Sequence, residues 1–85
     1  MHYVYVLRSV EDEKFYIGYT SDLARRIEEH KRGGVHTTSR LSDPKLIFYE
    51  SFISERDALR REKYFKTTKG KKALKLILRD SIKIT

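Results

Sequence analysis

The sequence predicts a small α+β domain, in which a three-stranded antiparallel sheet is flanked by about three helices in the order β-β-α-β-α-α. Two short runs of β-branched and aromatic residues lie close together near the N-terminus, and such runs favour strands. A helical pattern, a third apolar run and two further helical patterns follow. Because the chain has 85 residues, 39% of them hydrophobic, we expect a single domain over residues 1–85 with a modest core.

The first two predicted strands are residues 2–7 and 15–19, and a short polar link joins them. A link this short favours an antiparallel hairpin. It contains no Asn-Gly or Asp-Gly pair, so the register stays open, and with it whether Tyr5 and Tyr16 face the same side. Gly18 shares a face with Tyr16, and a glycine inside a strand often marks a close approach by another group.

The next segment is predicted to be a helix that begins at the N-cap Ser21 and runs to about Arg32, before a pair of glycines. Arg26 and His30 lie one turn apart, on the edge of its apolar stripe. They would therefore point a fixed cation and a titratable ring toward the protein body. For Arg26 the alternative is a stem packed on the core with its charged head in water.

Residues 35–44 form a polar loop that is long for a linker. Its hydroxyl groups and Arg40 suit contact with phosphate, and an ordinary surface loop is the alternative. The apolar residues 46–52 then predict a third strand, which we expect at the centre of the sheet.

The second helix is expected to begin with a capping box formed by Ser54 and Asp57 and to run to about residue 67. Its apolar stripe includes Leu59, and Glu62 lies near the middle of that stripe. A buried carboxylate needs a compensating cation. Either Lys66 or Arg26 forms a salt bridge with it, or it is a ligand for a hard divalent cation such as Mg²⁺.

The C-terminal part is predicted to contain a basic turn at residues 69–72 and a short third helix after it. This helix would bury Ala73, Leu74, Ile77 and Leu78 on one face. Residues 80–85 show an alternating pattern that fits a short edge strand or a docked tail, and the sequence leaves the choice open.

Composition excludes several classes of protein. The chain has no cysteine, hence no disulfide and no thiolate metal site. No segment is long and apolar enough to cross a membrane, and no secretion signal is visible, so we expect a soluble, cytoplasmic protein with no membrane partner and no small-molecule cofactor. The net charge of +7 lies entirely in residues 44–85. That distribution favours a polyanionic partner, with a solvated, solubilising face as the alternative.

These residues together resemble the GIY-YIG nuclease family. The first triplet, residues 3–5, reads Tyr-Val-Tyr, so only its final tyrosine matches Gly-Ile-Tyr, whereas Tyr16-Ile17-Gly18 is intact. The family's Leu-x-x-Arg-x-x-x-His pattern is matched by Leu23, Arg26 and His30, and its metal-binding glutamate by Glu62. The length is similar to the small stand-alone bacterial branch. Some relatives add an asparagine after the glutamate, and this chain contains none.

The resemblance implies a metal-dependent endonuclease that hydrolyses phosphodiester bonds, with DNA as the first expected substrate, RNA as the second, and a role in DNA repair or processing. The expected substrates include single strands and nucleic acids recognised by their structure. The cofactor would be Mg²⁺ or Mn²⁺. The implied catalytic residues are Tyr5, Tyr16, Arg26, His30 and Glu62, with Glu62 also the metal ligand. We favour Tyr16 as the general base, assisted by Tyr5 and His30. Charge patterning adds six residues expected to bind nucleic acid: Arg40, Lys63, Lys66, Lys69, Lys71 and Lys72.

Two other functions are compatible with the sequence. The chain could be a non-catalytic basic module that binds nucleic acid through its cations and aromatic rings. It could also be a protein-interaction domain that offers residues 46–52 as an exposed edge strand. Glu62 speaks against the first of these, because a polyanion binder gains nothing from an acid within its basic run.

Overall fold

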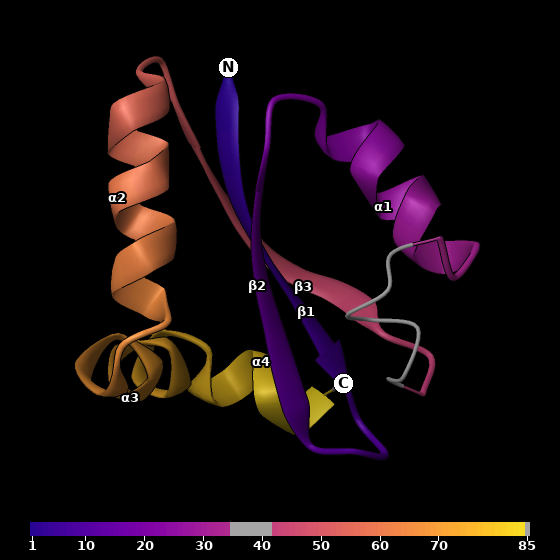
Figure 1. The fold of residues 1–85 in the computed structure, drawn as a ribbon. Coiled ribbons are helices and arrows are strands. Elements are labelled where there is room, and N and C mark those ends of the chain that lie inside the picture. The colour runs from indigo at the N-terminus through magenta and orange to yellow at the C-terminus, as the bar shows by residue number, and fades with distance from the viewer. Residues whose placement is uncertain (35–41, 85) are drawn as a thin grey trace.

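A three-stranded antiparallel sheet with helices on both faces forms the fold, in a computed structural model that describes residues 1–34 and 42–84. Figure 1 shows the arrangement. The elements are β1 (His2–Ser9), β2 (Lys14–Thr20), α1 (Leu23–Lys31), β3 (Lys45–Phe52), α2 (Glu55–Phe65), α3 (Thr68–Ile77) and α4 (Arg79–Ile84). The predicted α+β class and the order of the first six elements are confirmed.

The sheet has the order β2-β1-β3, with both pairs antiparallel. The expectation that β3 is central is wrong, because β1 occupies that position. The reason lies in burial: β1 carries an uninterrupted buried run, Val4 to Leu7, as a strand covered on both faces must. By contrast β3 leaves Leu46 and Tyr49 exposed, as a sheet edge allows.

The hairpin register pairs Tyr5 with Gly18 and Leu7 with Tyr16. Residues paired in this way project their side chains on the same face, so Tyr5 and Tyr16 share one face of the sheet. A Cβ atom at Gly18 would overlap the ring and hydroxyl of Tyr5. Because Gly18 has no side chain, the Tyr5 ring can lie against its backbone. The predicted close approach at this glycine is confirmed.

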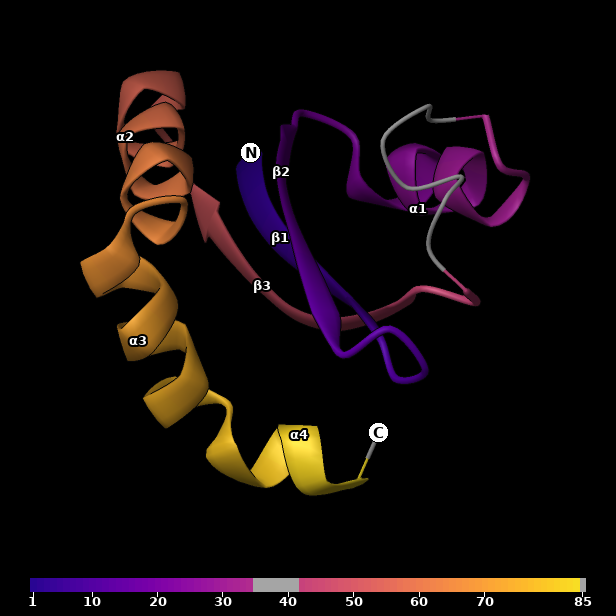
Figure 2. The same cartoon turned by 60° about the horizontal axis from the view of Figure 1, so that its bottom comes forward.

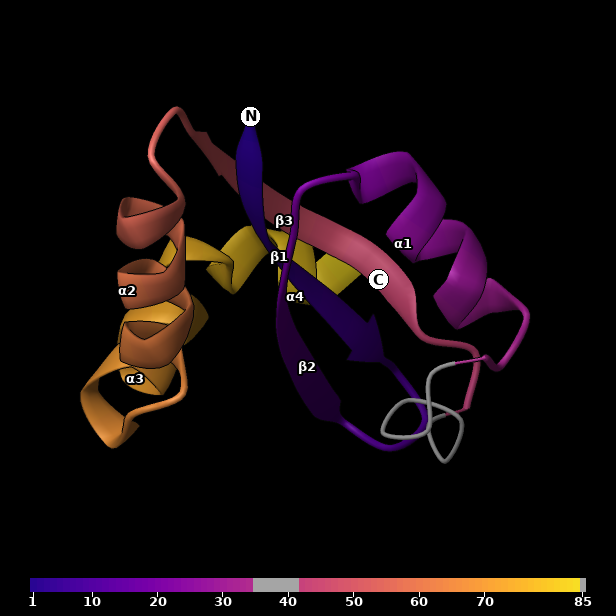
Figure 3. The same ribbon diagram turned by 45° about the horizontal axis from the view of Figure 1, so that its top comes forward.

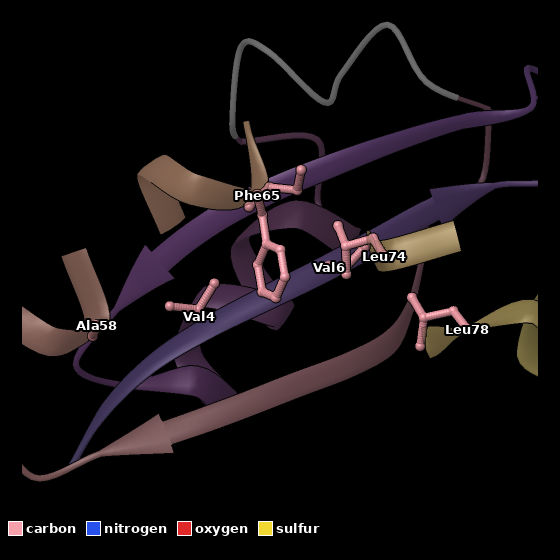
Figure 4. Close-up of a cluster of buried hydrophobic side chains, with 7 residues drawn as sticks. Val4, Val6, Ala58, Phe65, Leu74 and Leu78 are labelled. Carbon is pink, nitrogen blue, oxygen red and sulfur yellow. The ribbon is translucent and has the colours of Figure 1, made fainter. Parts of the chain in front are cut away.

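The apolar core lies on the opposite face of the sheet. Helices α2, α3 and α4 lie on that side, away from α1 (Figure 2). Its buried members are Val4, Val6, Ile17, Ala58, Phe65, Leu74 and Leu78, most of which Figure 4 labels. At Gly70 a Cβ would overlap the carbonyl group of Tyr64, so α3 can approach the end of α2 closely only with glycine at this position. Leu59 and Ile77 were expected in this core but are exposed.

Helix α1 lies on the other face of the sheet, away from α2 and α3 (Figure 3). Its N-cap is Asp22 rather than the expected Ser21, and an Asp22 carboxylate oxygen accepts the backbone N–H of Arg25 at 3.2 Å. Carboxylate and hydroxyl are both good N-caps, which is why two adjacent candidates were hard to separate. The helix ends before Gly33, whose positive φ of 71° suits a glycine.

The predicted capping box of α2 is wrong. Ser54 is the N-cap but makes no side-chain capping hydrogen bond. The Asp57 carboxylate instead accepts from Arg60 at 3.1 Å. The helix ends at Phe65, two residues earlier than expected.

The C-terminal segment differs from its prediction in two places. Residues 69–72 are the first turns of α3 rather than a turn, and the Thr67 hydroxyl caps this helix by accepting the Gly70 N–H at 3.0 Å. Residues 79–84 form the helix α4, so the edge-strand alternative is wrong, whereas Ile82 does pack on the core as a docked tail would. None of the described helices combines the length and apolar character needed to span a membrane.

Candidate active site

Four of the predicted catalytic side chains meet on the α1 face of the sheet. Tyr5 comes from β1, Tyr16 from β2, and Arg26 and His30 from successive turns of α1. The Tyr5 hydroxyl lies 2.8 Å from Nε2 of His30, and Nε of Arg26 donates to the same hydroxyl at 3.4 Å. The hydroxyl of Tyr5 therefore links both α1 residues to the sheet.

The rings of these residues enclose His30. Its centroid lies 5.1 Å from that of Tyr16 and 5.6 Å from that of Tyr5, both in edge-to-face arrangements. Tyr5 and Tyr16 are 6.1 Å apart. Tyr5 is fully buried and His30 is 4% exposed, whereas Tyr16 is only partly buried. Of the two tyrosines, Tyr16 is thus the one that a bound substrate or water can reach more readily.

Burial keeps both Tyr5 and His30 neutral near neutral pH. It raises the pKa of Tyr5 to about 12, against a lowering by the hydrogen bond from Arg26 and with a further increase from Tyr16. The pKa of His30 is lowered, first by burial and then by the positive charge of Arg26. The Tyr5 hydroxyl thus accepts from Arg26 and shares a hydrogen bond with Nε2 of His30, in which the donor is set by the tautomer of the imidazole.

The alternative for Arg26 was a stem packed on the core with its charged head in water. The structure instead shows the head in contact with protein groups. The guanidinium contacts the Tyr5 hydroxyl and the Glu29 carboxylate, the latter at 3.4 Å. The hydrogen bond to Tyr5 is the main cause that raises the pKa of Arg26. The result is a fixed cation held at the edge of the tyrosine and histidine cluster.

Glu62 lies on α2, on the opposite side of the sheet from α1. Its carboxylate pairs with Lys66 at 3.1 Å, and its side chain is 21% exposed. Of the two salt bridges considered from the sequence, the pair with Lys66 is formed, and the described contacts include none with Arg26. The charge of Glu62 is the smallest of the causes that raise the pKa of Tyr19, after burial and Glu55.

The donor atoms near Glu62 suit a loosely held Mg²⁺ ion rather than a dedicated cage. Among residues 1–34 and 42–84, no group of three or more His, Cys, Asp or Glu side chains could hold a metal ion. Mg²⁺ is commonly bound through one or two carboxylates, with water and substrate phosphate completing its coordination. A single accessible carboxylate at Glu62 fits that pattern.

Sequence reasoning missed a second hydrogen-bonded group at the same edge. The Tyr19 hydroxyl donates to Glu55 at 3.0 Å and lies 2.8 Å from Nδ1 of His2. The rings of His2 and Tyr19 are stacked, with centroids 6.1 Å apart. Strand alternation alone puts Tyr19 on the face opposite Tyr16, and the seven-residue spacing puts Glu55 on the same side of α2 as Glu62. Those two signals could have suggested the grouping.

An open pocket of about 330 Å³ is lined by one member of each group, Arg26 and Tyr19. Tyr19 lines it from β2, the connection of residues 20–22 follows, and α1 contributes Arg25, Arg26 and Glu29. The pocket therefore lies between the end of the edge strand β2 and helix α1.

The residues expected to bind nucleic acid are mostly on α2 and α3. Lys63, Lys66, Lys69, Lys71 and Lys72 are all exposed. Lys66 differs from the other four, because it is paired with Glu62. Arg40 lies outside the described residues.

Comparison with known proteins identifies the family of this chain. The family model of the GIY-YIG catalytic domain matches residues 1–75, and the chain therefore belongs to the GIY-YIG family. Within it, the chain is similar to small proteins called UPF0213. The UPF0213 protein CPE1444 of Clostridium perfringens is 39% identical over 84 residues, covering 98% of this chain and 89% of the relative. YazA of Bacillus subtilis is 40% identical over 72 residues, covering 84% and 72%.

A solved structure supports the fold as well. The solution NMR structure of the UPF0213 protein BH0048 from Bacillus halodurans aligns with a TM-score of 0.56 and 34% identity, covering 89% of this chain and 83% of that one. Membership of the GIY-YIG family implies endonuclease activity on a nucleic-acid substrate, and the family generally depends on a divalent metal.

Proposed function

We propose that this protein is a Mg²⁺-dependent endonuclease that hydrolyses phosphodiester bonds in DNA, in DNA repair or processing in the cytoplasm. The observation that carries the proposal is the meeting of Tyr5, Tyr16, Arg26 and His30 on one face, with Gly18 leaving room for the Tyr5 ring. Hydrolysis of a phosphodiester requires activation of a water molecule and stabilisation of negative charge on phosphorus-bound oxygens. This cluster contains groups for both tasks.

Tyr16 is the proposed general base. Tyr5 is the poorer candidate, because it is fully buried and its pKa is raised to about 12. The proton taken from water can pass from Tyr16 through the Tyr5 hydroxyl to the neutral ring of His30, since Tyr5 contacts both. Tyr5 and His30 then act as assisting residues that relay and hold the proton.

Arg26 is proposed to stabilise the charge that develops on the phosphate. Its guanidinium is already fixed by Tyr5 and Glu29, so little reorganisation is needed when a phosphate enters the pocket. Glu62 would hold Mg²⁺ or Mn²⁺, whose bound charge would supply further stabilisation of the phosphate oxygens. Lys66, displaced from Glu62 by the ion, would become available for the nucleic-acid backbone.

The exposed lysines of α2 and α3 are proposed to supply most of the affinity, together with Arg40. Contacts of this kind release counterions and carry little sequence information. We therefore expect modest, salt-sensitive binding and selection by substrate structure, such as single strands or forks, rather than by sequence.

The direct test is to incubate the purified protein with labelled single-stranded DNA, duplex DNA, forked DNA and RNA, in Mg²⁺ or in a chelator. We expect metal-dependent cleavage of DNA. The variants Tyr16→Phe and Glu62→Gln should bind the same substrates with unchanged affinity and cut them at least about 100-fold more slowly. Glu28→Gln is the matched control for the loss of one carboxylate, since Glu28 is an exposed residue of α1.

The alternative is a non-catalytic basic nucleic-acid-binding module, which the completed ion pair between Glu62 and Lys66 favours. It predicts binding that is independent of metal, with no cleavage of any of the four substrates. That result would overturn the nuclease proposal. Cleavage of RNA alone would retain the reaction but replace the substrate.

A further inference from the structure

Cleavage of a phosphodiester produces an alkoxide leaving group that must acquire a proton. A positioned general acid is the usual source. The roles proposed above for Tyr5, Tyr16, Arg26 and His30 all concern the attacking water and the phosphate oxygens. They assign no proton donor to the leaving oxygen, and a further side chain at the pocket could act as that donor.

Tyr19 has the position for such a donor. It lines the pocket from β2, and Arg26 lines the same pocket from α1. It lies three residues after Tyr16 on an edge strand, hence on the other face of the sheet. A phosphate held by Arg26 in this pocket would thus lie between groups of the two faces.

The hydrogen bonds of Tyr19 fix the orientation of its hydroxyl. It donates to Glu55 at 3.0 Å and accepts from Nδ1 of His2 at 2.8 Å. Glu55 is exposed, so water can replace Tyr19 as its partner at little cost when the hydroxyl turns to a substrate. Burial and then the hydrogen bond and charge of Glu55 raise the pKa of Tyr19, which keeps it in the protonated form that a general acid requires.

We propose that Tyr19 is the general acid that protonates the leaving 3′ oxygen, an inference that rests on the proposed nuclease function. The bond between phosphorus and the 3′ oxygen breaks with its electron pair on oxygen, while the water oxygen forms the new bond to phosphorus. The leaving oxygen takes the proton of the Tyr19 hydroxyl. The resulting tyrosinate recovers a proton from solvent.

The test compares two leaving groups in the variant Tyr19→Phe. One oligonucleotide carries the normal 3′ oxygen at a mapped cleavage site, and the other carries a bridging 3′ sulfur there. A thiolate is a far weaker base than an alkoxide and leaves without a general acid. We expect Tyr19→Phe to slow cleavage of the oxygen substrate by about 100-fold or more and to leave cleavage of the sulfur substrate nearly unchanged.

Two controls separate this role from others. Tyr16→Phe should slow both substrates, because the attacking water is the same in each. Tyr49→Phe removes a hydroxyl from a tyrosine that is 52% exposed on β3 and should change neither rate. Circular dichroism of Tyr19→Phe verifies the fold.

The outcomes distinguish the two proposals. If the wild-type protein cuts and Tyr19→Phe slows both substrates equally, or slows neither, Tyr19 is not the general acid while the nuclease function stands. If the wild-type protein cuts neither substrate in Mg²⁺, both proposals fail.

Discussion

The two faces of the sheet differ in chemistry although the same strands build both. Toward α2, α3 and α4 the sheet presents Val4, Val6 and Ile17, which pack into an apolar core. Toward α1 it presents Tyr5 and Tyr16, which join His30 and Arg26 through hydrogen bonds and ring contacts. Alternation along β1 thus places valine and tyrosine on opposite sides of one buried strand.

The two faces therefore differ in what they contribute: the apolar face contributes mainly to folding stability, and the α1 face holds the polar groups of the candidate site. Burial of aliphatic and aromatic carbon is the main favourable term in folding, and it is concentrated on the first face. The second face buries polar groups, whose hydrogen bonds contribute less to stability but fix positions and protonation states. Substitutions on the two faces should therefore give different signatures, and the following predictions test that contrast.

The largest effect is expected for Phe65→Ala on the apolar face. Phe65 is fully buried and contacts the ring of Phe48. Its truncation should lower the free energy of unfolding by about 3–5 kcal/mol, a large part of the roughly 5–15 kcal/mol typical of a domain. Urea denaturation measures the change. Leu76→Ala, at a residue that is 65% exposed on α3, is the control and should cost little; equal losses in the two variants would contradict the assigned core.

Arg26→Ala should have the largest effect on the α1 face, and it should affect rate more than binding. Loss of a fixed charge donor typically lowers kcat by about 100- to 1000-fold. The neighbouring Arg25 lines the same pocket but is exposed. Arg25→Ala should instead raise KM and reduce the salt dependence of binding by about one phosphate contact. Steady-state kinetics at several salt concentrations would separate the effects of the two variants. The same increase in KM in both would make Arg26 an ordinary contact to the nucleic-acid backbone.

Gly18→Ala should affect both stability and activity, because Gly18 lies beside Tyr5 on the α1 face. The added methyl group would overlap the Tyr5 ring, so the ring must move away from His30 and Arg26. We expect a loss of about 1–3 kcal/mol in stability and a fall in cleavage rate larger than that of the folded fraction. Gly34→Ala adds the same methyl group at an exposed glycine and should change neither property. Full activity in Gly18→Ala would show that the position of Tyr5 is not critical.

The smallest effect is a pH dependence of stability that comes from His30. Its folded-state pKa lies below the ordinary value of 6.5, so the unfolded chain binds the proton more readily. This contribution to stability is complete above pH 6.5 and is lost as the pH falls through the lowered pKa. The difference in unfolding free energy between wild type and His30→Gln, measured from pH 5 to 7.5, isolates the term. A difference that does not change with pH would contradict the lowered pKa.

Most of the helices and strands could be predicted because residue composition and spacing within a short segment determine them. Strand composition located β1 and β2, the glycines after α1 located its end, and the turn-by-turn spacing placed Arg26 and His30 on one face. The order of the strands in the sheet cannot be predicted from local patterns alone, because it depends on how the strands pair and which faces the helices cover. The central position of β1 is visible in the folded structure, where its run Val4 to Leu7 is buried and Tyr49 of β3 is exposed.

The site was predicted in part for the same reason. Tyr5, Tyr16, Arg26 and His30 were identified by motif, and the hairpin register then determined that they meet. The contacts of Tyr19 join residues that are 17 and 36 positions apart in sequence; local spacing places each residue on a face of its element, but only the packing of the elements pairs them. Likewise, the alternating isoleucines near the C-terminus suit a strand, yet no strand edge is paired with them and they form α4 instead.

The hydrogen bond between Tyr5 and His30 makes the imidazole a built-in spectroscopic reporter. A neutral imidazole in one tautomer carries its proton on a single nitrogen, so its two ring nitrogens have widely different ¹⁵N chemical shifts. The chain has three histidines, so the His30 signal can be assigned by comparison with His30→Gln. In the proposed relay, arrival of the water proton would make both nitrogens donors and bring their shifts together, so that the relay can be tested at His30 itself.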